Sequence, residues 1–441
     1  MRKIVAALTL ILVLVAFIPF INGLLMETTI RRAFANINAL HADTGAGYSL
    51  EIVNYNRGYL TSDIDWKIDF GALNALYRID GVVFTDHAKH GFGGVVSTTS
   101  LADNPWYAAF VNQMLQGKDP VHISTVYRLF GNMETTVIVD AFSAMVEGVT
   151  IQIKPGSLVV ATDRHLTEFV SSGSWQGLSA GETLSVGRAS VASNLNMVST
   201  HIWNGDIRFD VEKISGKEKD GQFEISGMEG SYILNVDDDQ RTLSAEAWLS
   251  VDRFNAKNAV VDESSVRFAT KGLDINGYEA FMQMVTQSMS EYLANMASYE
   301  NAPEMAKASV NQQLATIGFQ MMAAYEKLLK AGLTVQISDL RANLPAGNIN
   351  GQLTLRLLKD MRFVEFIPIA GQPERLFDYL YLKSKVSLPV KLIGENPKLL
   401  APMVPGMQTG LFVRNGKLLT HQAETIDGKL MLNNHELILT P

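Results

Sequence analysis

The nine residues Ser62-Asp63-Ile64-Asp65-Trp66-Lys67-Ile68-Asp69-Phe70 decide the fold class of this chain. Apolar side chains occupy every second position, at Ile64, Trp66, Ile68 and Phe70, and charged side chains stand between them. A period of two places alternate residues on opposite faces of a β-strand. One face of this strand is therefore predicted to be dry and the other solvated, which is typical of antiparallel sheets.

The same alternation recurs on both sides of this stretch. Ser49 to Tyr55 is predicted as the preceding strand, with Asn56-Arg57-Gly58 as the turn between the two. We expect a mainly β protein with some helices, in which residues 47–275 form a long, curved antiparallel meander that a short helix from Asp103 to Gly117 interrupts. Further strands are predicted at Met133–Val139, Ile207–Val211, Phe223–Leu234, Ser244–Val251 and Ser265–Ala269.

Two helices in hairpin order are predicted within residues 276–332. The first has an apolar stripe that includes Phe281, Val285 and Leu293, and the second begins at a capping box of Asn301 and Glu304. Each helix has only one apolar face, so that face must cover another surface. The dry face of the sheet is the surface that we expect this inserted hairpin to cover.

Residues 333–441 are predicted as a second β region with short helices. Strands are expected at Leu333–Ser338 and Gln352–Leu357, and the turn at Pro345–Gly347 closes this hairpin. Glu374–Lys383 and Asn396–Met403 have the pattern of short helical pieces. A last β segment is expected from Gly410 to Leu439.

The N-terminal residues 1–26 have the composition of a transmembrane anchor. Ile4 to Ile21 contains Thr9 as its only polar side chain, and Arg2 and Lys3 precede it. A helix needs roughly 20 apolar residues to cross a bilayer, and preceding basic residues hold the N-terminus in the cytoplasm. We expect a single-pass inner-membrane protein with its C-terminal part in the periplasm, and a linker helix over residues 27–46. A cleaved signal peptide is the alternative, although its apolar region is typically about 7 to 15 residues long.

The composition of the chain excludes several classes of function. Cysteine is absent, so disulfides, thiolate metal sites and a cysteine nucleophile are excluded. The formal net charge is -8 and no cluster of Lys and Arg is present, which argues against a nucleic-acid partner. We predict no cofactor and no metal. The oligomeric state stays open.

Three local patterns resemble functional motifs. Gly177-Leu178-Ser179-Ala180-Gly181 fits the nucleophile elbow of serine hydrolases, but that motif needs a helix after the serine and Thr183 to Ala192 alternates like a strand. Asp86, His87 and His90 are metal-ligand types, but they lie beside what we interpret as a hairpin loop at Lys89–Gly94. Asp237–Asp239 lacks the spaced oxygens of a calcium loop and is interpreted as a solvated turn.

Several turns of the chain resemble those of a known bacterial family. Tyr55–Ser62, Trp175–Ser179 and the closing segment with Asn415-Gly416 and Gly428-Lys429-Leu430 are similar to the YdgA/YihF-like family, and the likeness covers essentially the whole chain. Asn434 stands where a glycine is usual, which puts the geometry of the last turn in question. The resemblance implies an inner-membrane-anchored protein of a Gram-negative envelope. It implies no catalytic residue, because the family has no established activity.

Three functions remain open from the sequence. The first is a non-catalytic module that binds lipid or another envelope component in an apolar groove, with Ile64, Trp66, Ile68 and Phe70 as the candidate lining. The second is an envelope scaffold whose sheet is fully packed. The third, a serine hydrolase that uses Ser179, is the weakest because the local pattern around that serine is unsuitable.

Overall fold

The computed structural model defines the backbone over most of the chain. The described residues are 2–44, 48–71, 81–101, 103–128, 131–218, 221–237, 241–256, 259–299, 304–365, 372–395 and 406–437. Within these ranges, the side chains of residues 2–16, 40–44, 218, 289–299, 304–311, 313–314, 373 and 393–395 lie outside the description.

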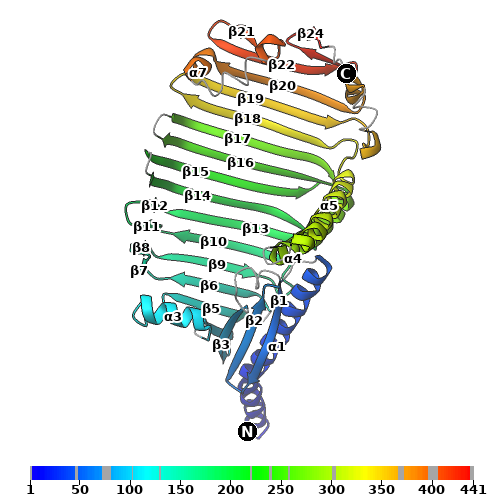
Figure 1. Cartoon of the computed structure of the whole chain (residues 1–441). Helices are drawn as coiled ribbons and strands as arrows, with labels where there is room; N and C mark the ends of the chain where they lie inside the picture. Colours follow the sequence, from blue (N-terminus) through cyan, green and yellow to red (C-terminus); the bar gives the residue numbers. More distant parts are fainter. Residues whose placement is uncertain are drawn as a thin grey trace. The chain divides into compact units, whose positions relative to one another are not determined.

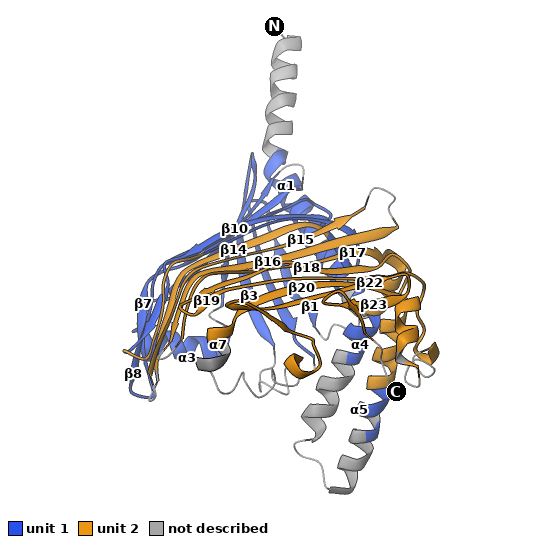
Figure 2. Cartoon of the chain, turned by 90° about the horizontal axis from the view of Figure 1, so that it is seen from above, with its two compact units in different colours: residues 1–181, 190–203, 283–317 blue, residues 182–189, 204–282, 318–441 orange. Residues whose placement is uncertain are grey.

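The protein is mainly β, as predicted, and the pairings whose register is defined in the described part of the chain are antiparallel (Figure 1). The strands belong to one large sheet. By internal contacts the chain forms two compact units, which Figure 2 colours separately. Unit 1 comprises residues 1–181, 190–203 and 283–317, and unit 2 comprises residues 182–189, 204–282 and 318–441. This division cuts across the predicted ranges 47–275, 276–332 and 333–441.

Unit 1 is a run of short strands in which most neighbours along the chain are also neighbours in the sheet. The pairing order is β1-β2-β3-β4-β5-β6-β9-β10-β13, and β7, β8 and β11 form a side ladder. The strands are β1 (Ser49–Arg57), β2 (Thr61–Asp69), β3 (Val82–Gly91), β4 (Gly94–Ser100), β5 (Val121–Arg128), β6 (Met133–Val139), β7 (Phe142–Val146), β8 (Val149–Ile153), β9 (Gly156–Thr162), β10 (Glu168–Trp175), β11 (Leu178–Ala180) and β13 (Ala189–Ser199).

The helix that leads into unit 1 is longer than predicted. The expected anchor and linker helix are one continuous helix, α1 (Arg2–Thr44), which contains Pro19. Proline has no N–H and removes one helical hydrogen bond, but the helix continues through it. Within the described part of the chain, no helix is both long enough and apolar enough to cross a membrane. Most of the predicted anchor, residues 2–16, lies outside the described side chains.

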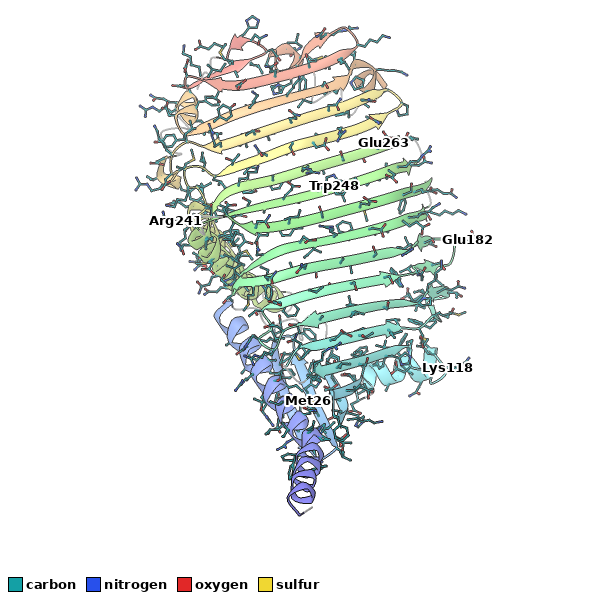
Figure 3. The ribbon with its side chains drawn as sticks, turned by 180° about the vertical axis from the view of Figure 1, so that it is seen from behind. Met26, Lys118, Glu182, Arg241, Trp248 and Glu263 are labelled. Carbon is teal, nitrogen blue, oxygen red and sulfur yellow. The ribbon has the colours of Figure 1, made fainter. Side chains whose placement is uncertain are left out.

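The core of unit 1 lies between α1 and the sheet. Met26 and Ile30 of α1 pack against Ile64 of β2, Ala88 of β3 and Val95 of β4, and all five side chains are at most 6 % exposed. The helix contacts β1, β3 and β4, and Met26 is labelled on it in Figure 3. The predicted dry face therefore exists, and at this end α1 covers it.

Unit 2 contains the longest strands. The pairing order is β12-β14-β15-β16-β17-β18-β19-β20-β22-β23-β24, with β21 also on β22. The strands are β12 (Leu184–Val186), β14 (Ile202–Glu218), β15 (Gly221–Val236), β16 (Thr242–Ala256), β17 (Ala259–Asp274), β18 (Thr334–Leu344), β19 (Gly347–Leu357), β20 (Leu380–Pro389), β21 (Val413–Asn415), β22 (Leu418–Ile426), β23 (Lys429–Leu432) and β24 (His435–Glu436).

Four neighbouring strands of unit 2 are irregular at the same level. Glu212, Gly227, Asp252 and Glu263 are each skipped by the pairing register of β14 to β17. Gly227 and Glu263, the latter labelled in Figure 3, have left-handed φ values of 59° and 46°. The register is the same on both sides of these positions, so no residue is inserted in any strand and the interruption of the pairing is shared by all four strands.

The turn between β23 and β24 contains Asn434, the residue whose effect on the turn geometry was in question. Asn433 and Asn434 connect β23 to β24 with φ values of 46° and 69°. A two-residue hairpin turn of type I′ needs a positive φ at both positions, and asparagine adopts it more readily than most residues. Asparagine therefore fits the backbone conformation that position 434 adopts in this turn.

The remaining helices agree only in part with the sequence pattern. The helices α3 (Pro105–Met114), α4 (Ile275–Tyr299) and α5 (Glu304–Glu326) correspond to the predicted ones. The predicted helix at Glu374–Lys383 is wrong beyond Asp378, because the short 3-10 helix η1 (Pro373–Asp378) gives way to β20. The short helix α7 (Val390–Glu395) follows β20. The capping residue Asn301 and the helix expected at Asn396–Met403 lie outside the described residues.

Candidate functional site

The predicted groove residues on β2 occupy two different environments. Ile64 is 0 % exposed and lines no open groove, because Met26 and Ile30 of α1 close the face above it. Trp66 packs edge-on against Phe34 of α1, with ring centroids 5.5 Å apart. Ile68, further along β2, and Phe70, just after it, are half-buried. This part of the predicted site is a packed interface between helix and sheet.

A buried carboxylate lies beside this interface. Asp86 of β3 accepts hydrogen bonds from the indole Nε1 of Trp66 (3.0 Å) and from the Thr99 hydroxyl. Burial raises the pKa of Asp86, and burial together with the Asp86 charge raises the pKa of Tyr127. Burial also raises the pKa of Tyr55 to about 12. All of these groups are enclosed, so they organise the interface rather than meet a substrate.

His90 is a further buried titratable group under α1. Its Nε2 lies 2.9 Å from the Ser62 hydroxyl, and its Nδ1 lies 3.2 Å from the Tyr59 carbonyl oxygen. A carbonyl oxygen only accepts, so Nδ1 carries the proton and Ser62 donates to Nε2. This is the arrangement of a serine nucleophile with its base. Ser62 is 1 % exposed and His90 6 %, however, so neither is open to a substrate.

The other motifs also have defined positions. Ser179 lies in β11, and the chain continues through a turn into β12 rather than into a helix. The loop assigned to Lys89–Gly94 is shorter than predicted, because β3 extends to Gly91 and places His87 and His90 on the strand. His87 is exposed and pairs with Asp63 at 2.6 Å.

Metal-ligand side chains do not gather in the described part of the chain. Asp237 accepts hydrogen bonds from the Thr242 and Ser244 hydroxyls, at 2.7 and 2.6 Å. Asp238 and Asp239 lie outside the described residues. Across the described part of the chain, no three His, Cys, Asp or Glu side chains are arranged to hold a metal ion.

Unit 2 has an exposed apolar face that the predicted sequence motifs do not include. Residues directly opposite each other in neighbouring antiparallel strands share a face. The register from β14 to β19 thereby places apolar residues in two adjacent rows, which we call the apolar rows. The first row is Ile207, Tyr232, Ala247, Phe268, Ile337 and Leu353, and the second is Phe209, Gly230, Leu249, Val266, Leu340 and Gly351.

The apolar rows are accessible rather than packed. Ile207, Phe209, Tyr232, Leu249, Phe268 and Leu340 are each 36 to 43 % exposed. The ring of Phe209 lies directly against Gly230, and the Leu340 side chain lies against Gly351, so the two glycines leave no gap in the second row. Large exposed apolar patches on soluble surfaces mark binding sites.

The opposite face of the same strands is polar. Arg208, Ser231, Trp248 and Arg267 form one cross-strand row there, and Trp248 is labelled in Figure 3. Arg208 pairs with Asp206 at 3.0 Å, and Arg267 pairs with Glu246 at 3.0 Å. The sheet of unit 2 therefore has one solvated face and one apolar face, as an antiparallel sheet can.

The apolar rows end at a hydrogen-bonded serine and histidine. The register continues the first row from Leu353 to Ser384 of β20. It continues the second row from Gly351 through Val386 of β20 to His421 of β22, so Ser384 and His421 both lie on the apolar face. The Ser384 Oγ is 2.7 Å from His421 Nε2, and His421 Nδ1 is 2.9 Å from the Leu411 carbonyl oxygen. By the same argument as for His90, Ser384 donates to Nε2. In contrast to Ser62 and His90, both side chains are partly exposed.

Part of this arrangement could have been found in the sequence. Leu382, Ser384, Val386 and Leu388 alternate with lysines and a serine, which is a strand pattern that places Ser384 on the apolar side. The assignment of residues 374–383 to a helix hid it. The approach of Ser384 to His421 depends on the register of β20 with β22, and no local pattern gives that register.

A comparison with known protein families matches residues 1–439 to the bacterial protein of unknown function DUF945. No curated protein and no solved structure matches the chain. The match extends over α1 and both units, so it describes the chain as a whole. The chain therefore belongs to the DUF945 family of bacterial proteins.

Proposed function

We propose that this protein is a non-catalytic, membrane-anchored envelope protein that binds an acyl chain of a membrane lipid along the apolar rows of unit 2. The observation that carries the proposal is the exposure of six large apolar side chains on one face of neighbouring strands. A ligand that covers exposed apolar surface of this kind lowers the free energy of the complex, because the surface is removed from water.

The dimensions of the rows favour an acyl chain. They cross six strands, β14 to β19, and five spacings of about 4.8 Å give a length of about 24 Å. One leaflet contributes half of a hydrocarbon core about 30 Å thick, so a lipid chain extends about 15 Å along the bilayer normal. The rows are therefore long enough for one acyl chain to lie across the strands.

The polar end of such a ligand has a suitable partner. Ser384 and His421 lie where the rows reach β20 and β22. Both ring nitrogens of His421 are already bonded, but the Ser384 oxygen can still accept a hydrogen bond from a hydroxyl or ammonium group of a lipid headgroup. We assign this pair a binding role rather than a catalytic one. A serine nucleophile also needs free donors for the developing oxyanion, whereas the backbone of β20 around Ser384 is paired with β19 and β22.

The location in the envelope rests on the N-terminal sequence. Ile4 to Ile21 is apolar and follows Arg2 and Lys3, which favours a cytoplasmic N-terminus and a periplasmic C-terminal part. The similarity of Tyr55–Ser62 to the YdgA/YihF-like proteins supports the same inner-membrane location. An anchor of this kind keeps the apolar rows close to a source of lipid.

In-cell photocrosslinking tests the proposal. Phe209, in the second row, is replaced by p-benzoylphenylalanine in cells whose phospholipids carry radioactive phosphate. The matched control replaces Ser231, which lies on the opposite face of the neighbouring strand β15. We expect lipid-labelled protein from position 209 and none from position 231. Adding Leu249→Asp should abolish the labelling at 209, because a charge on the row repels an acyl chain.

The outcomes separate the two main functions. Equal labelling at 209 and 231, or none at either, contradicts lipid binding by the rows. Protein adducts at 209 without lipid favour the envelope scaffold instead. Leu249 is 39 % exposed, so Leu249→Asp buries no charge, and an unchanged circular dichroism spectrum verifies its fold.

A further inference from the structure

Two turns of unit 1 lie beside the helix that leads to the N-terminus. Tyr59 and Leu60 connect β1 to β2, and Phe92 connects β3 to β4. The two turns are joined, because the His90 N–H donates to the Leu60 carbonyl oxygen at 2.7 Å. All three apolar side chains are nonetheless exposed, at 48 % for Tyr59, 55 % for Leu60 and 61 % for Phe92. The two turns therefore present exposed apolar side chains next to α1.

Direct contacts fix the level of these turns along α1. The Phe20 ring stacks on the Tyr59 ring, with centroids 6.0 Å apart. Next to the second turn, the Asn22 side-chain amide donates to the carbonyl oxygen of Gly91, the last residue of β3, at 2.6 Å. The turns therefore lie level with residues 20–22 of α1.

The same level is where the apolar N-terminal segment ends. From Pro19 onward α1 is held against unit 1, since Pro19 is buried, Asn22 is 3 % exposed, Met26 is 1 % exposed and His90 lies against the backbone of Gly23. Ile4 to Ile21 is eighteen residues, which as a helix with a rise of 1.5 Å per residue extends about 27 Å. A hydrocarbon core is about 30 Å thick, so no length is left over to separate the sheet from the bilayer.

The outer side of α1 extends this apolar surface. Phe17 and Ile21 are 50 % and 46 % exposed, and Leu24 and Leu25 are also exposed on the side turned away from the sheet. Phe17, Ile21, Tyr59, Leu60 and Phe92 are thus exposed apolar side chains at or near the level where the apolar N-terminal segment ends. Aromatic residues are enriched at the boundary between membrane and water, where an apolar ring can sit beside headgroups.

We propose that the turns at Tyr59–Leu60 and at Phe92 rest in the interfacial layer of the bilayer that α1 enters. The partner is a lipid surface, and the turns, together with α1, give unit 1 three points of contact with it. Three points fix the tilt of unit 1 on the membrane, which a single helix cannot do. The inference rests on the membrane anchor of the proposed function and is independent of the apolar rows.

The absence of cysteine makes a direct test possible. Single variants Leu60→Cys and Phe92→Cys of the full chain are labelled with the environment-sensitive fluorophore NBD. They are reconstituted into vesicles of phosphatidylethanolamine and phosphatidylglycerol that contain spin-labelled lipids. Phe17→Cys reports on the anchor, and Glu147→Cys, in the exposed turn between β7 and β8, is the matched control within unit 1.

At positions 60 and 92, as at position 17, we expect the NBD emission to shift to the blue and lipids spin-labelled at the headgroup to quench it. At position 147 we expect neither change. If NBD is quenched at position 17 but is as little quenched at 60 and 92 as at 147, the contact of the turns with the membrane is contradicted and the anchor is not. No quenching at 17, 60 or 92 overturns both. Matching circular dichroism spectra of the four labelled proteins verify that each is folded.

Discussion

At the scale of single residues, the contact between α1 and the sheet depends on one glycine. A β-carbon added at Gly23 would collide with the His90 ring. His90 cannot withdraw, because Ser62 and the Tyr59 carbonyl hold both of its ring nitrogens. The absence of a side chain at position 23 is therefore a condition for the approach of helix and strand.

Gly23→Ala should lower the free energy of unfolding by about 1–3 kcal/mol, the usual cost of forcing extra volume into a packed interface. Gly93→Ala is the control, because nothing lies within 4 Å of a β-carbon at that turn, and its effect should stay within about 0.5 kcal/mol. Urea denaturation of the detergent-solubilised full chain, followed by circular dichroism, measures both. Equal stability of the two variants would show that α1 does not dock through Gly23.

At the scale of elements, the dry face of β2 has a different cover from the one that the sequence suggested. The predicted cover was the helical hairpin of residues 276–332, whereas Met26 and Ile30 of α1 fill the space over Ile64. Both helices of the hairpin exist, and Phe281 of α4 contacts Tyr325 of α5 with ring centroids 4.8 Å apart. An amphipathic stripe shows that a helix needs a partner and does not say which surface that partner is.

Two adjacent residues of α1 test how much this cover stabilises the sheet. Met26 is 1 % exposed and Leu25 is 45 % exposed. Met26→Ala should cost about 2–5 kcal/mol, since it leaves a cavity against Ile64, Ala88 and Val95. Leu25→Ala should cost much less. Hydrogen exchange with mass spectrometry should show faster exchange in β2, β3 and β4 of the Met26 variant alone, and equal exchange in both variants would contradict the packing role of α1.

At the scale of the whole molecule, the two units differ in how their apolar sheet faces are used. In unit 1, α1 and the cluster around Ile64 close the face at β2 to β4. In unit 2 the apolar rows stay exposed. The chain has no cysteine, so burial such as that around Ile64 has to stabilise it without disulfides. The open face of the second unit is the one to which we assign the proposed binding.

The orientation of the chain in the envelope is testable by fusion. A reporter that is active only outside the cytoplasm, fused after Pro441, should be active, because Arg2 and Lys3 keep the N-terminus inside. Replacing both basic residues by glutamate should reduce that activity. An inactive reporter on the unaltered chain, or a mature N-terminus near Gly23, would contradict the anchor.

The sequence alone determined which residues share a face, and the tertiary structure decided what each face meets. Alternation from Ser62 to Phe70 and along β14 to β17 predicted strands with a dry side, because the period of two is a local property of the backbone. The partners were not local. Ile64 became core because α1 folds back over it, and Ser384 meets His421 through a register between strands 37 residues apart. Such registers depend on packing across the whole sheet, which no short stretch of sequence contains.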